Sequence, residues 1–67
     1  MVSYKIISGH EILMSGELET EHNNVSGYIG ELKQLAEHTL FRGIEVVLEL
    51  QFSNAQKPII KHYTVGE

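Results

Sequence analysis

The sequence predicts an α+β domain in which one helix packs across one face of a four-stranded antiparallel sheet, in the order β-β-α-β-β. Three observations support this fold class. Residues 2–20 and 44–65 carry apolar side chains at alternate positions, as β-hairpins do. Between them, residues 25–41 carry apolar side chains at steps of three or four, as an amphipathic helix does. Two hairpins joined by a helix most simply form one sheet with the helix on one face.

The length bounds the organisation of the chain. The 67 residues are expected to form a single compact domain, residues 1–67, because so small a core cannot be divided and remain stable. Cysteine is absent, so disulfides and thiolate metal sites cannot stabilise this core. A metal bound through other ligands or a second subunit could still do so.

Composition and charge exclude several classes of protein. No apolar run reaches the ~18 residues of a membrane span, and the start MVSYKII lacks the features of a signal peptide, so a cytoplasmic protein without membrane contacts is expected. The net charge is -4 at pH 7. The basic residues are scattered, at Lys5, Lys33, Arg42, Lys57 and Lys61. Because no basic patch is visible, nucleic-acid binding is not expected.

Residues 2–20 predict the first hairpin, with a turn at Gly9, His10 and Glu11. This turn would pair Ser8 with Ile12, Ile6 with Met14, Tyr4 with Gly16 and Val2 with Leu18, which gathers the large apolar side chains on one face. Tyr4 would then cover the gap left by Gly16. On the opposite face, Ile7 would lie across from Leu13.

The helical segment begins after a polar connection. Asn24 or Asn23 is a suitable N-cap, with Ser26 as a further candidate. The apolar stripe comprises Val25, Tyr28, Ile29, Leu32, Leu35, Ala36 and Leu40. Arg42 and Gly43 should end the helix, since a cation suits its negative end and glycine can take positive φ.

Two glycines inside this helix need an explanation. Gly27 and Gly30 each cost about 1 kcal/mol relative to alanine in a helix interior. Either the helix packs closely against a strand at these positions, or a ligand or partner backbone approaches them. Together with Tyr28, they are candidate residues for binding a partner or ligand.

The second hairpin is predicted from Ile44 to Val65. Five apolar residues alternate along its first strand, and Pro58 suits the start or edge position of its second strand. A four-residue loop at residues 54–57 would pair Phe52 with Ile59, Leu48 with Tyr63 and Val46 with Val65 on the buried side. The other side would pair Gln51 with Ile60, Glu49 with His62 and Val47 with Thr64.

One helix covers only one face of a sheet, and the second face is only partly polar. Its apolar residues are Ile7, Leu13, Val47 and Ile60. A cluster of this kind predicts a self-association surface. We therefore expect a homodimer, formed through this face or by strand pairing at an edge; a monomer with a mixed surface is the alternative.

The histidines do not form a catalytic or metal-binding motif. Three of the four adjoin a glutamate in sequence, but neighbours in a strand or helix point in different directions. No H-E-x-x-H spacing, nucleophile elbow or phosphate-binding loop occurs. We therefore expect no enzyme activity, no cofactor and no metal site, and interpret the histidines as ordinary surface or turn residues.

An acidic run, Glu17, Glu19 and Glu21, lies on one face if the strand extends that far. It is either a solvated face that deters edge aggregation or a stripe that docks on a basic protein surface. Glu17 and Glu19 are candidate partner-binding residues.

These observations predict a small acidic non-enzymatic binding protein, a dimeric adaptor or inhibitor that occupies a protein partner's surface. The alternative is a small-ligand binding or sequestering protein with its pocket at a subunit interface. Small cytoplasmic proteins of phages and mobile elements share this size and composition, which is an analogy only.

Overall fold

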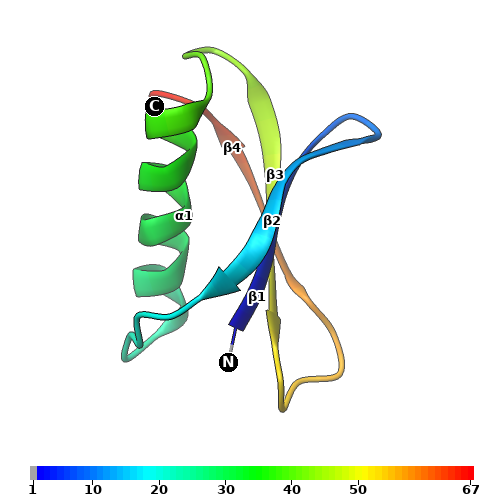
Figure 1. Ribbon diagram of the computed structural model, residues 1–67, viewed down its shortest axis with the longest axis vertical. Helices are drawn as coiled ribbons and strands as arrows, with labels where there is room; N and C mark the ends of the chain where they lie inside the picture. The colour runs from blue at the N-terminus through cyan, green and yellow to red at the C-terminus, as the bar shows by residue number, and fades with distance from the viewer. Residues whose placement is uncertain (1) are drawn as a thin grey trace.

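The computed structural model describes residues 2–67 and confirms the predicted α+β architecture (Figure 1). The elements are β1 (Val2–Ser8), β2 (Glu11–Leu18), α1 (Val25–Thr39), β3 (Glu45–Phe52) and β4 (Ile59–Thr64). Across these residues, no helix has the length and apolar character needed to cross a membrane.

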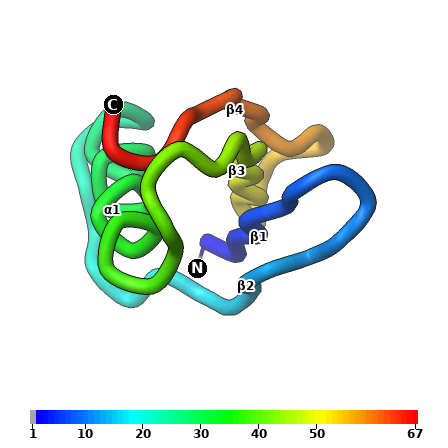
Figure 2. The backbone as a smooth tube through the Cα atoms, turned by 90° about the horizontal axis from the view of Figure 1, so that it is seen from above, coloured from blue at the N-terminus to red at the C-terminus, as the bar shows by residue number. Residues whose placement is uncertain are grey.

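The four strands form one antiparallel sheet in the order β2-β1-β3-β4. Strands β1 and β3 therefore lie at the centre, and each hairpin contributes one edge strand. Helix α1 lies on one side of the sheet, while the loops of both hairpins turn toward the other side (Figure 2). The sheet is strongly twisted, as expected for a small antiparallel sheet.

The first hairpin differs from the prediction near its turn. The pairs from Val2–Leu18 to Ile6–Met14 are as expected, but Ser8 pairs with Glu11 across a two-residue turn. Gly9 has φ +62, as the first position of a type II′ turn requires, and such turns match the twist of the flanking strands. A β-bulge at Leu13 then absorbs the extra residue.

The second hairpin keeps its predicted faces but shifts its register by two residues. Leu50, not Phe52, pairs with Ile59, and Val47, not Glu49, pairs with His62. The carbonyl of Phe52 accepts hydrogen bonds from the Ala55 backbone N–H at 3.1 Å and from the Gln51 side-chain amide at 3.0 Å. These bonds close a turn directly after β3 and lengthen the connection before β4.

Helix α1 starts as predicted and ends earlier than predicted. The side chain of Asn24 accepts a hydrogen bond of 3.0 Å from the Gly27 backbone N–H, which identifies Asn24 as the N-cap. The helix ends at Thr39, with Leu40 in extended conformation as the C-cap. Gly43 does take positive φ, at +90, but its N–H bonds to Val65 O, so it forms the entry to β3 rather than the helix end.

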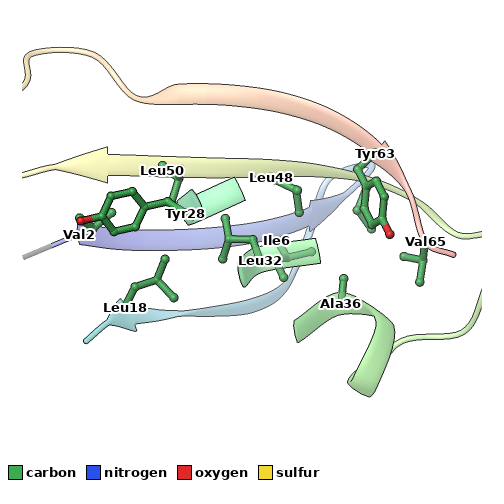
Figure 3. Packing of buried hydrophobic residues seen from close by; sticks show 11 residues of the cluster. Val2, Ile6, Leu18, Tyr28, Leu32, Ala36, Leu48, Leu50, Tyr63 and Val65 are labelled. Atoms are coloured by element: carbon green, nitrogen blue, oxygen red, sulfur yellow. The ribbon is translucent and has the colours of Figure 1, made fainter. Parts of the chain in front are cut away.

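The core lies between α1 and the sheet (Figure 3). Its fully buried side chains include Ile6 from β1, Leu32 and Ala36 from α1, and Leu48 and Leu50 from β3. The predicted apolar stripe of the helix thus faces the core, except that Val25 in the first turn remains 39% exposed. Because burial of this apolar layer is favourable, it determines which side chains of the helix and strands face outward.

Candidate binding surfaces

His22 organises the start of the helix. Its imidazole packs against Gly27, where an added Cβ would stand only 2.7 Å from His22 Cβ. The ring also meets the edge of Tyr28 at a centroid distance of 4.8 Å, and Tyr28 in turn meets Phe52 at 5.3 Å. Edge-to-face contacts at these distances are favourable. Gly27 is therefore required by close packing, although the neighbour is the connecting segment and not a strand.

His22 also pairs with a carboxylate that the sequence did not indicate. Its Nε2 lies 2.7 Å from Glu31 Oε1, and each side chain is 26% exposed. The two residues are nine positions apart, and the backward turn of the connection onto Gly27 brings them together. No local spacing rule covers such a pair. The carboxylate fixes the orientation of the ring. His22 and the residues that it contacts, Gly27, Tyr28 and Glu31, form what we call the His22 cluster.

An acidic pocket lies beside the His22 cluster. Its volume is about 360 Å³, and its walls include Val2, Leu18 and Tyr28. The acidic run Glu17, Glu19 and Glu21 also lines it. The strand ends at Leu18, so the condition for a single acidic strand face, a strand that extends to Glu21, is not met. Glu17 lines the pocket from β2, and the turning connection adds Glu19 and Glu21 beside the same apolar floor.

The face of the sheet away from α1, which we call the open face, has no covering element among residues 2–67 (Figure 1). A row of side chains crosses all four strands here, formed by Ile12, Ile7, Val47 and His62. The next row contains Ser15, Lys5, Glu49 and Ile60. Ile12 is 54% exposed and Ile60 is 57% exposed. The open face thus combines apolar side chains with a central pair of opposite charges.

The bulge changes one of the predicted self-association residues. Leu13 is half-buried and packs against the core, so it does not lie with Ile7, Val47 and Ile60 on the open face. Ile12 takes its place opposite Ile7. A bulge points two consecutive side chains to similar sides of a sheet, which alternation alone could not reveal.

A cavity of about 630 Å³ extends over one end of the open face and around the edge of β4. Ile7 and Val47 form its apolar part, and His62, Glu45 and Thr64 supply polar groups. This volume falls within the range of small-molecule sites.

Tyr63 connects the other side of β4 to the helix. Its hydroxyl donates to Glu37 Oε1 at 2.9 Å and accepts from the Gly66 N–H at 3.3 Å. The Nζ atom of Lys33 lies 5.1 Å from the centre of the ring, a cation–π arrangement. Burial raises the pKa of the Tyr63 hydroxyl above its ordinary value, and the hydrogen bond to Glu37 raises it further.

The structure brings together Tyr28, Gly27, Glu17 and Glu19 around the acidic pocket and the His22 cluster. Gly30 lies apart from them. A Cβ at Gly30 would meet no atom within 4 Å, so close packing does not explain this glycine. Phe41 is 84% exposed because the helix ends before it. The periodicity of residues 25–41 did not predict this exposure.

Within the described residues, no group of three or more His, Asp or Glu side chains could hold a metal ion. Comparison with protein-family models, with curated proteins and with solved structures found no match to this chain.

Proposed function

We propose that this protein is a small acidic, non-enzymatic binding protein, a homodimeric adaptor or inhibitor that occupies the surface of a protein partner. The observation that carries the proposal is the open face. Ile7, Ile12, Val47 and Ile60 lie on it, and two of these side chains are more than half exposed. Apolar groups clustered on one sheet face are typical of an interface.

The size of the open face suits a weak dimer. Four strands of about six residues cover roughly 20 Å by 19 Å, which is about 380 Å² per copy. Two copies would bury about 800 Å², the size of a weak, transient interface.

Charge favours the open face over either sheet edge as the contact. Two β2 edges related by a two-fold axis would bring Glu11 and Glu17 of both copies together, and the bulge at Leu13 interrupts that edge. Two β4 edges would bring the Lys61 side chains together. On the open face, Lys5 and Glu49 lie side by side, so a two-fold axis near them places opposite charges across the interface.

The acidic pocket is the proposed contact with the partner. Its glutamates surround apolar walls, an arrangement that suits the insertion of an arginine or lysine side chain with its aliphatic stem. Glu19 and Glu21 lie beyond the end of β2, so a dimer formed through the open face leaves them accessible.

The dimer is tested by replacing exposed apolar residues in matched pairs. We compare the double variant Ile12→Lys/Ile60→Lys with Val25→Lys/Phe41→Lys, which makes the same charge change away from the open face. Light scattering should give twice the 7.6 kDa chain mass for the wild type and the control, and the single-chain mass for the open-face variant. Equal masses for the two variants would contradict the proposal.

The partner contact is tested by affinity capture with variants of equal charge. The double variant Glu19→Gln/Glu21→Gln removes the two pocket carboxylates that lie beyond β2. The control, Glu11→Gln/Glu67→Gln, removes two exposed carboxylates elsewhere. A genuine partner should be recovered in stoichiometric amount with the wild type and the control and lost with the pocket variant. A protein whose recovery falls equally with both variants is bound by net charge alone, and one recovered equally with all three forms does not use the pocket carboxylates. Either result would contradict the proposed contact.

The cavity over the open face favours a second candidate function, the binding or sequestering of a small ligand at the subunit interface. A second copy placed on this face would close the cavity beside His62. Native mass spectrometry of the purified dimer distinguishes the candidates. A small molecule that co-purifies with the dimer, and is absent from the Ile12→Lys/Ile60→Lys variant, would support this function over protein binding.

A further inference from the structure

We propose that the groove between α1 and β4 binds an extended peptide segment of a partner protein, one whose groove-facing residues, at every second position, include both apolar and acidic side chains. The segment would add to the sheet as a fifth strand beside β4. This site lies apart from both the open face and the acidic pocket, and the inference goes beyond the proposed function. Four observations carry it: a free strand edge, a groove, an unexplained glycine and two lysines.

Strand β4 ends the sheet, so one of its sides has no neighbouring strand among residues 2–67. Val65 N donates to Ile44 O at 2.9 Å, which identifies the odd-numbered residues of β4 as those bonded to β3. The backbone groups of Ile60 and His62 therefore point outward from the edge. They form a template to which an extended segment can add.

The helix converts this edge into a groove. In Figure 1, β4 approaches the C-terminal half of α1 and diverges from its N-terminal half. The resulting groove has a volume of about 380 Å³, with Val25 and Ile29 of α1 facing Ile59 of β4. Alternate side chains of an added strand would enter this groove and meet these apolar groups.

Gly30 forms the open part of the groove wall. A Cβ there would meet nothing within 4 Å, so alanine would fit and would make a better helix. Gly27, three residues earlier, is explained by its contact with His22, whereas no contact among residues 2–67 explains Gly30. Close approach of a bound segment explains a glycine at this position.

The charge of the groove differs from that of the protein. Two of the five basic residues, Lys33 and Lys61, line it, although the net charge of the chain is -4. Lys33 is held in place over the ring of Tyr63, 5.1 Å from the ring centre. These cations complement carboxylates among the groove-facing side chains of a bound segment, while the apolar lining of the groove complements apolar side chains on the same face of that segment.

The probe is a capped peptide of about seven residues, a usual strand length, in which every second residue is in turn valine or glutamate and the residues between them are threonine. One face of the strand then carries both kinds of side chain. Titration into the isotope-labelled protein should shift the backbone amide signals of Ile60 and His62 and of residues around Gly30. A control peptide with lysine in place of glutamate should bind much more weakly, because it meets the same two lysines. Shifts confined to β2 or to the open face would contradict the proposal.

Two variants separate groove binding from non-specific attraction. Gly30→Leu fills the groove and should abolish binding, while the protein stays folded because leucine is a good helix former. Lys61→Gln should weaken binding about five-fold, whereas Lys57→Gln in the exposed loop, with the same charge change, should not. Unchanged affinity in Gly30→Leu would overturn the inference. The mass of the dimer, measured alongside, tests the proposed function separately.

Discussion

The same substitution at two helix glycines should have opposite effects on stability. Gly30→Ala adds a Cβ in open space, so only the gain in helix propensity remains. The free energy of unfolding should rise by about 1 kcal/mol, which raises the melting temperature by roughly 4–8 °C for a domain of this size.

Gly27→Ala should instead destabilise the protein. The new Cβ would stand 2.7 Å from His22 Cβ and 2.8 Å from its Cγ, about 1 Å closer than carbon atoms at their contact minimum. The His22 ring must move, which weakens its 2.7 Å contact with Glu31 and its edge contact with Tyr28. Losses of about 1 kcal/mol for each exceed the helix gain, so a net loss of about 1 kcal/mol is expected.

Urea unfolding at one fixed protein concentration measures both variants, since self-association makes apparent stability depend on concentration. The decisive control repeats Gly27→Ala in a His22→Gly background, which removes the Cβ as well as the ring, so the clash is gone and the substitution should become neutral or stabilising. If Gly27→Ala stabilises the wild type as Gly30→Ala does, the packing account of the helix start is refuted.

Three further outcomes follow from single contacts. Asn24→Ala should lower the free energy of unfolding by about 1 kcal/mol, measured by denaturant titration, because the helix loses its N-cap. Tyr63→Phe should cost about 1 kcal/mol through the lost bond to Glu37. Because the pKa of Tyr63 is raised on folding, wild-type stability should be full below pH 10, where the unfolded tyrosine is still protonated, and fall as the pH rises through the folded-state pKa; thermal melts of the phenylalanine variant should lack this fall. Leu13→Lys should lower the melting temperature far more than Ile12→Lys, since Leu13 packs against the core and Ile12 is 54% exposed; equal effects would contradict the bulge.

Periodicity in the sequence was sufficient to predict the elements and the two faces of the sheet. The large apolar side chains of α1 lie on one stripe, and those of β3 lie at alternate positions. Each element can therefore bury these side chains in only one orientation. Local rules also identified the Asn24 cap and the positive φ of Gly43. These features depend on neighbouring residues alone, which is why the sequence suffices for them.

Features that depend on how turns close were not predictable in this way. A two-residue turn followed by a bulge gives the same strand pairs, from Val2–Leu18 to Ile6–Met14, as the predicted three-residue turn. The two arrangements differ at Leu13, which the bulge turns toward the core. A shift of two residues in the second hairpin leaves every side chain on its predicted face, so face burial cannot reveal it. The pairing of His22 with Glu31 depends on a connection whose path only the structure gives.

Protection of thiols on the open face tests the central proposal most directly. The chain has no cysteine, so a single Ser15→Cys substitution introduces one exposed thiol on the open face, and Ser26→Cys provides a matched thiol on the helix. Reaction rates with a thiol reagent are measured across protein concentrations around the ~10 μM dissociation constant suited to a small interface. We predict that the Ser15→Cys thiol becomes protected as concentration rises while the Ser26→Cys thiol does not. Equal, concentration-independent rates at both positions would contradict a dimer formed through the open face.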